Sequence, residues 1–369
     1  MALIKVVASK SFIKRSIVMR FIFLIPDFYP GVIVNRINQV LRFSRSKLLG
    51  DFVRLRMMPV DEVHGGTLNI MRHCAVARSC GADAVLATIR GKDTYGKEYG
   101  LFDLPFIRWA DRRPEDVCIV PDLWTELINE VQGPTIAYLQ VPIHTRNNFD
   151  YLSDRISVWT DSPYMQAICE QTYPNKTVEI VPNIVDSQLF PFIPQAEREP
   201  GVLFAFPRKG REFIAATQAH YQALGGTYWK FELINGLTIH ELTEQFKRPQ
   251  VFLASAEIEG CALPPQESMA SGIVVIGRTA KGANFCMEHR QTAMTAETPE
   301  EAAHCLLELE DAELRNTLSL NAHEYISQFF PDRTPKLFWQ QVIDGYTSSP
   351  PVAFPSSSNQ SMPAVEKVA

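Results

Sequence analysis

The 369-residue sequence lacks several features that would each define a class of protein. It contains no run of about 18 apolar residues, so we expect no membrane-spanning helix. Its seven cysteines include no C-x-x-C pair, which leaves a zinc site and a disulfide framework without support and fits a reducing cytoplasm. It contains no D-x-D pair that would suggest a metal ion. Its net charge of −5 does not indicate nucleic acid binding.

The positive charge that is present gathers at the start of the chain, where residues 1–60 hold eleven Lys or Arg and two Asp. Apolar residues recur at roughly helical spacing through 31–56. A basic amphipathic helix of this kind is typical of a segment that lies on an anionic membrane surface. The same pattern fits an ordinary helix whose apolar stripe docks on the protein core, so both interpretations stay open.

Apolar runs of strand length alternate with helical patterns along the chain, which predicts an α/β fold with mainly parallel sheets. A segment rich in proline, 186–200, divides the alternation into two rounds. We therefore predict two doubly wound, Rossmann-like domains with a cleft between them. The predicted division is an extension at 1–18, a first domain at 19–185 with a basic insertion at 31–62, a linker at 186–200, a second domain at 201–332, a terminal helix at 333–346 and a disordered tail at 347–369.

The most informative stretch is 251–277, which reads as strand, loop, helix and strand. Pro264 and Pro265 open the helix, and Gly272 ends it. Glu259 in the loop and Glu267 in the helix are separated by seven residues. A helix N-terminus suits phosphate, and a carboxylate beside it suits the hydroxyl groups of a ribose, so the pattern favours a nucleotide site. The alternative is that Glu267 is an ordinary acidic residue in a first helical turn.

Three further features lie where predicted strands end. Gly65-Gly66 begins a predicted helix and suits close approach to a phosphate, although such a pair is also an ordinary turn. Arg208 and Lys209 follow a strand and could neutralise a diphosphate, or form a solvated turn. His144 follows another strand, where a buried polar role competes with a catalytic one.

These residues carry a resemblance to a known family. The stretch EGCALPPQESMASGIVVIG is similar to the E-x7-E signature of the family 4 retaining glycosyltransferases, which have the GT-B fold. FIFLIPDFYP, the later GGT, IVPNIVDSQLF and FPRKG match other parts of the family in order. Ala262 stands where the family's usual form has a second loop glycine, and Cys261 where it has an aromatic residue.

The resemblance implies that the second domain binds a nucleotide-sugar donor and that the first, with helix 333–346 packed back toward it, faces the acceptor. Glu267 would bind the ribose, Glu259 would face the donor sugar, and Arg208 with Lys209 would neutralise the leaving diphosphate. His144 would touch sugar or acceptor from the first domain. The expected catalytic residues are Glu259, His144, Arg208 and Lys209. The expected donor-binding residues are Glu267, Gly260, Cys261, Ala262, Leu263, Gly65 and Gly66.

The resulting hypothesis is a cytoplasmic retaining glycosyltransferase that acts on a saccharide or lipid-linked acceptor in polysaccharide or glycoconjugate synthesis, without a metal or other cofactor. It would be peripheral to the inner face of a membrane if 31–56 is an anchor. Two alternatives remain. One is a binding or scaffold protein with a degenerate GT-B site, which Ala262 and the adjacent basic pair favour. The other is a GT-B-like nucleotide-sugar epimerase, which needs further acid and base groups in the cleft.

Overall fold

The computed structural model describes residues 19–25, 28–29, 58–59, 65–89, 91, 104–142, 151–181, 183–329 and 333–348. The predictions for 1–18, for most of the insertion 31–62 and for the tail beyond residue 348 lie outside the described residues. Residues 28–29 before the insertion and 58–59 near its end are described. They pair as a short antiparallel ladder, β2 (Phe28–Tyr29) with β3 (Met58–Pro59).

The first of two parallel sheets contains seven strands among the described residues, in the order β5-β4-β1-β6-β7-β8-β9. Its central strands are buried along their whole length, as expected for a parallel sheet with both faces covered. Phe21 of β1, for example, lies between Ala84 of β4 and Val117 of β6. The strands are β1 (Arg20–Leu24), β4 (Asp83–Thr88), β5 (Phe106–Arg108), β6 (Val117–Pro121), β7 (Thr135–Leu139), β8 (Ile156–Thr160) and β9 (Val178–Ile180).

The second sheet contains five parallel strands in the part of the chain that the structure describes, in the order β11-β10-β12-β13-β14. Leu203 of β10 lies between Phe231 and Val251. The predicted α/β fold with two parallel, doubly wound sheets is therefore confirmed. The strands are β10 (Val202–Ala205), β11 (Lys230–Leu233), β12 (Val251–Ala254), β13 (Val274–Gly277) and β14 (Ala293–Thr295).

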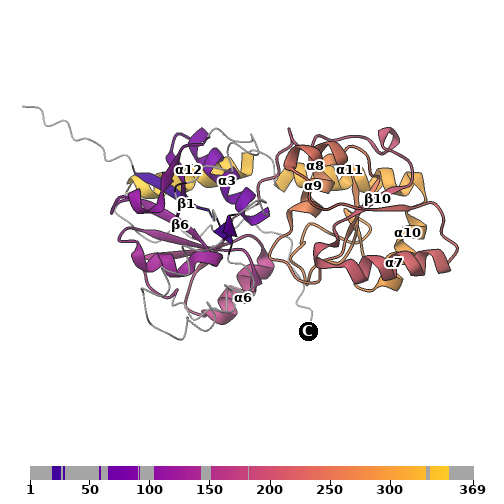
Figure 1. The fold of residues 1–369 in the computed structure, drawn as a ribbon, viewed down its shortest axis with the longest axis horizontal. Helices are drawn as coiled ribbons and strands as arrows, with labels where there is room; N and C mark the ends of the chain where they lie inside the picture. Colours follow the sequence, from indigo (N-terminus) through magenta and orange to yellow (C-terminus); the bar gives the residue numbers. More distant parts are fainter. Residues whose placement is uncertain are drawn as a thin grey trace, which may run out of the picture.

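The strand order reverses once in each sheet, between β1 and β6 in the first and between β10 and β12 in the second. At such a point, the connections leave the carboxyl ends of two adjacent strands toward opposite faces and open a crevice. The ribbon shows the two sheets side by side, each with its own helices (Figure 1). The two reversal points are therefore where a ligand site is expected.

Helices cover the faces of both sheets (Figure 1). Gly272, with φ of 85°, ends α9 in the left-handed conformation predicted for it. After β6 the chain forms 3-10 turns, η2 (Asp122–Glu130). The backbone angles leave the helical region at Trp124, where the two turns meet. None of the described helices has the length and apolar character needed to cross a membrane. The helices are α3 (Gly65–Ser79), α6 (Pro163–Thr172), α7 (Arg211–Ala223), α8 (Ile239–Gln245), α9 (Leu263–Ser271), α10 (Pro299–Glu308), α11 (Ala312–Phe329) and α12 (Arg333–Ser348), with short 3-10 turns η1 (Trp109–Asp111), η3 (Gln195–Glu197) and η4 (Pro207–Lys209).

The last helix, α12, returns to the first sheet, where it lies beside α3 (Figure 1). Its anchor is Trp339, which is fully buried. The Trp339 ring packs edge-on against Phe21 and Trp159, and its Nε1 donates a hydrogen bond of 3.0 Å to Nδ1 of His73. The chain therefore passes from the first sheet to the second through 186–200 and returns to the first sheet with α12.

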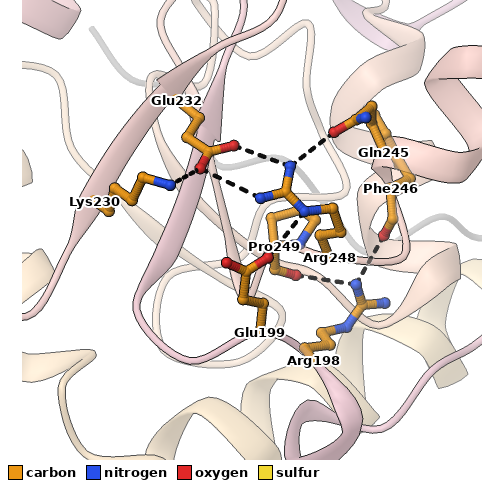
Figure 2. Close-up of polar contacts among 8 residues, drawn as sticks. All are labelled: Arg198, Glu199, Lys230, Glu232, Gln245, Phe246, Arg248 and Pro249. Carbon is orange, nitrogen blue, oxygen red and sulfur yellow. Dashed lines mark hydrogen bonds and ion pairs between the residues drawn. The ribbon is translucent and has the colours of Figure 1, made fainter.

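The segment between the two sheets is fixed by Arg198, which is 2% exposed. Its guanidinium group donates hydrogen bonds to the backbone carbonyls of Ile193, Phe246, Pro249 and Ser271. Figure 2 shows two of these bonds. Burial lowers the pKa of Arg198 to about 10, so the group stays charged at neutral pH. One buried cation thus joins the incoming chain to the loop before β12 and to the end of α9.

Arg248 lies beside Arg198 but belongs to the surface. Its side chain is 36% exposed and pairs with the carboxylates of Glu199 and Glu232, while it also donates to Oε1 of Gln245 (Figure 2). Lys230 pairs with Glu232, which lies on the same strand, β11. Such exposed pairs add little stability because water already solvates both partners.

We expect Arg198→Ala to lower the free energy of unfolding by about 3 kcal/mol or more, because it leaves buried carbonyl groups without a donor. The matched control is Arg248→Ala, which removes surface pairs and should cost about 1 kcal/mol or less. Urea unfolding followed by circular dichroism measures both. Equal losses for the two variants would contradict the assignment.

Candidate functional site

A cavity of about 530 Å³ lies between the carboxyl ends of the two sheets. Its second-sheet wall consists of the loops after β10 and β12 and the start of α9. Its first-sheet wall consists of the start of α3 and the residues after β6, β7 and β8. Both reversal points therefore open into one space, whose volume is typical of a small-molecule site. The segment 255–262 is named the β12–α9 loop below.

The β12–α9 loop is held against the first sheet. The hydroxyl group of Ser162 donates a hydrogen bond to the carbonyl oxygen of Gly260, and Nδ2 of Asn183 donates one of 3.1 Å to that of Cys261. A Cβ atom added at Gly260 would lie 1.8 Å from the carbonyl oxygen of Gln140, at the end of β7. Residue 260 must therefore be glycine for the two halves of the site to meet this closely.

Glu267, expected to bind a ribose, lies in α9 and is 3% exposed. Its Oε1 forms an ion pair of 3.0 Å with Nη2 of Arg72, which comes from α3 on the other side of the cavity. Burial raises the pKa of Glu267 above its ordinary value, and the positive charge of Arg72 opposes that rise. Nη1 of Arg72 also donates to the carbonyl oxygen of Ile184 at 2.7 Å. The carboxylate thus lines the cavity already held by a buried cation.

Lys209 and Glu259, both expected to be catalytic, are in direct contact. Nζ of Lys209 lies 2.5 Å from Oε2 of Glu259, and the two side chains are 42% and 19% exposed. Arg208 precedes Lys209 in η4 and also lines the cavity. A Cβ at Gly210 would lie 2.5 Å from the side chain and the carbonyl oxygen of Ser255, so the turn after β10 packs tightly on the end of β12. The two strand ends therefore bring cations and a carboxylate together.

The start of α9 is a weaker anion site than the sequence predicts. Leu263 is its first residue, and Pro264 and Pro265 follow. Proline has no N–H group, so two of the first three positions offer no donor. Ala262, at the N-cap, offers no side-chain cap either. A phosphate group here would depend on Arg208 and Lys209 for most of its stabilisation.

The glycine pair lies across the cavity from this helix. Gly65 is the first residue of α3, and a Cβ added there would lie 3.4 Å from Cδ1 of Leu263. Gly66 accepts a hydrogen bond of 3.4 Å from Nε2 of Gln140, and a Cβ on it would lie 3.0 Å from Oε1 of that side chain. His144, the remaining predicted site residue, lies outside the described residues, and its role stays a prediction.

Two carboxyl groups line the first-sheet wall. Asp122, at the start of η2, accepts hydrogen bonds from the backbone N–H groups of Gln140 and Val141 at 3.0 and 2.8 Å. Asp161 directly follows β8 and is 4% exposed. Burial raises the pKa of Asp161 well above its usual range, and the negative charges of Asp122 and then Glu259 raise it further. The wall thus holds a carboxyl group whose surroundings favour its protonated form.

Several solved structures share the fold of this chain. A glycosyltransferase from Rickettsia africae matches at a TM-score of 0.61 and 10% identity, over 88% of this chain and 98% of its own. Anabaena HepE, solved with UDP and glucose, matches at 0.59 and 13% identity, over 90% of this chain and 100% of its own. TarM matches at 0.52 and 11% identity over 63% of this chain, which spans 56% of the length of TarM. These are GT-B glycosyltransferases. The chain has the GT-B fold. No family model matches the chain, and no curated protein matches it in sequence.

The GT-B architecture explains which site residues sequence reasoning missed. Arg72 falls in the middle of a helical pattern and reads as a surface residue, because its partner is 195 positions away. Asp122 and Asp161 each lie at the carboxyl end of a predicted strand, where an acidic residue is a usable signal. The sequence offered that signal, and only the relative placement of the two GT-B sheets shows that both carboxyl groups line one cavity. No cluster of His, Cys, Asp and Glu suited to a metal ion occurs among the described residues.

We expect Arg72→Ala to lower the free energy of unfolding by about 3–5 kcal/mol, since it leaves the carboxyl group of Glu267 buried without its cation. Arg78→Ala, on the same helix, is the matched control. Arg78 donates to the carbonyl oxygen of Ala84 from a partly exposed position, so its loss should cost about 1 kcal/mol. Chemical unfolding measures both variants, and a cost no greater for Arg72→Ala than for Arg78→Ala would refute the role of the ion pair.

We expect Asp161→Asn to be more stable than the wild type at alkaline pH, because burial raises the pKa of the wild-type carboxyl group and the amide has no proton to lose. The unfolded chain loses the Asp161 proton near pH 4, whereas the folded chain keeps it to higher pH, so wild-type stability falls as the pH rises between these values. The advantage of the variant should therefore vanish near pH 4. Thermal unfolding against pH measures it, with the exposed Asp154→Asn as the control. A variant less stable than the wild type at every pH would show that Asp161 supports the fold.

Proposed function

We propose that the protein is a retaining glycosyltransferase, which moves a sugar from a nucleotide-sugar donor to a saccharide or lipid-linked acceptor. The observation that carries the proposal is the cavity between the carboxyl ends of the two GT-B sheets. Its second-sheet wall presents two cations, Arg208 and Lys209, and two carboxylates, Glu259 and Glu267. Cations suit a diphosphate, and carboxylates suit the hydroxyl groups of a ribose and a hexose.

The donor nucleotide fits along the second-sheet wall. Glu267 would accept hydrogen bonds from the ribose, held in place by Arg72. Apolar side chains continue this wall beyond η4 and would receive the base: Phe206, Leu237, Ile239 and Leu242. Anabaena HepE is solved with UDP and with UDP-glucose, which supports uridine nucleotides as the first donors to test.

The Lys209–Glu259 ion pair would change partners when the donor binds. Lys209 is partly exposed, so it can turn from the carboxylate to the diphosphate without a large desolvation cost. Glu259 would then face the donor sugar. Lys209 and Arg208 would stabilise the negative charge that grows on the leaving diphosphate. The acceptor hydroxyl group would attack from the same face and pass its proton to a donor phosphate oxygen, which retains the anomeric configuration and requires no metal ion.

The acceptor would approach from the first sheet. The predicted membrane segment 31–56 and His144 both belong to this half but lie outside the described residues. We propose that transfer takes place in the cytoplasm, with the basic segment as the contact to an anionic membrane surface in the course of polysaccharide or glycoconjugate synthesis.

A second candidate, a nucleotide-sugar epimerase, gains support from Asp122 and Asp161. That reaction needs acid and base groups beside the sugar, and these two carboxyl groups line the cavity. Incubation with a nucleotide sugar and no acceptor separates the candidates, because an epimerase yields a new nucleotide sugar and a transferase yields at most the free sugar and the nucleotide.

The test is a panel of UDP-, GDP-, ADP- and dTDP-sugars, measured by thermal shift and by release of the nucleoside diphosphate. Glu267→Gln should weaken donor binding about tenfold, the worth of one hydrogen bond to a charged group. Glu259→Gln should lower turnover about 100-fold. Glu257→Gln is the matched control, since Glu257 lies in the same loop with its side chain 65% exposed.

Two results would count against transfer. Absence of both a thermal shift and turnover with every member of the panel would refute a nucleotide-sugar enzyme. Donor binding without turnover, unchanged by Glu259→Gln, would instead identify a binding protein with a degenerate site.

A further inference from the structure

The side chain of Asp161 has an unusual position for a carboxyl group. It is 4% exposed, and its Oδ1 has no hydrogen-bond partner among the described residues. Folded proteins rarely bury a polar atom in this way, because the atom loses its bonds to water and gains none in return. The residue nevertheless lines the cavity between the two sheets. A carboxyl group that lines a cavity with its hydrogen bonds unmade can find a partner in a bound molecule.

The surroundings of Asp161 direct it toward the β12–α9 loop. A Cβ atom added at Gly260 would lie 3.2 Å from its Oδ1. Ser162, the next residue in the chain, donates a hydrogen bond to the carbonyl oxygen of Gly260. Asp161 therefore adjoins Gly260, the residue that follows Glu259 in the β12–α9 loop.

The charges around Asp161 favour the protonated carboxyl group, a form that can both donate and accept a hydrogen bond. Asp122 and Glu259 are the charged groups that act on it among the described residues, and both are negative. Three further titratable groups, a tyrosine and two cysteines whose pKa values are raised by burial, also interact with Asp161. The titratable groups that interact with Asp161 are Asp122 after β6, Tyr138 on β7, Cys169 on α6, and Glu259 and Cys261 in the β12–α9 loop.

We propose that Asp161 contacts the substrate: its carboxyl group hydrogen-bonds a hydroxyl group of the donor's sugar ring. The inference rests on the proposed function and adds a residue from the first sheet to the donor site. The negative charge of Asp122 disfavours a phosphate group beside Asp161, and a phosphate group finds cations at Arg208 and Lys209 on the second-sheet wall. A sugar hydroxyl group is neutral and can donate and accept, so it matches a protonated carboxyl group.

The experiment compares Asp161→Ala and Asp161→Asn with the wild type. Calorimetry measures two ligands for each: the nucleotide sugar that the wild type binds in the panel above, and the corresponding nucleoside diphosphate. We expect the diphosphate to bind all three proteins equally. The nucleotide sugar should bind Asp161→Ala about tenfold more weakly, the loss expected for one hydrogen bond. Asp161→Asn should bind it nearly as well as the wild type, because the amide N–H group replaces the carboxyl O–H group.

The pH dependence gives a readout that a structural role would not move. As the pH rises and Asp161 loses its proton, the wild type should bind the nucleotide sugar more weakly, whereas Asp161→Asn should show no such dependence. The exposed Asp154→Ala is the matched control and should follow the wild type.

Each outcome decides between the two proposals. If the wild type binds no nucleotide sugar, the proposed function fails and this inference fails with it. If the wild type binds one and Asp161→Ala binds it equally well, the inference alone fails. Equal weakening of the nucleotide sugar and the bare diphosphate in Asp161→Ala would also overturn it, because a lost sugar contact cannot affect a ligand without a sugar.

Discussion

The closeness of residue 260 to the carbonyl oxygen of Gln140 is the constraint on which the site depends. A side chain at this point would overlap the end of β7, so glycine alone lets the β12–α9 loop rest on the first sheet. With the loop in place, Ser162 and Asn183 bond its carbonyl groups from the other half of the molecule. The carboxyl ends of two separate sheets then enclose one cavity, whose walls bring together residues far apart in the sequence.

Buried charge holds the same junction from both sides. Arg72 reaches across the cavity to Glu267, and Arg198 gathers the carbonyl groups where the chain enters the second sheet. Both cations are almost fully buried, so each is costly to desolvate and strongly directional once paired. The hydrogen bonds and the ion pair of these two side chains impose one geometry on the linker and on α9.

The sequence predicts the parts of this fold that depend on neighbouring residues. Apolar runs mark the strands, Gly272 marks the end of α9, and the spacing of Glu259 and Glu267 marks the loop between β12 and α9. The sequence suggests a phosphate site at the first turn of α9. Pro264 and Pro265 remove two of the N–H groups that such a site would use, and the sequence itself contains this information. The Arg72–Glu267 and Asp161–Gly260 contacts arise from the packing of one sheet on the other, which no local pattern encodes.

Arg198 and Asp161 are both buried ionisable side chains, but they differ in whether the protein supplies their partners. Arg198 is buried but donates to several carbonyl groups, so its burial is compensated within the protein. Asp161 is buried with an unpartnered oxygen and faces two negative groups, so its burial is not compensated. Under the proposed function, a sugar hydroxyl group of the donor supplies the partner that Asp161 lacks. The partly exposed Lys209–Glu259 pair is weak enough, under the same proposal, to be exchanged for a diphosphate and a sugar.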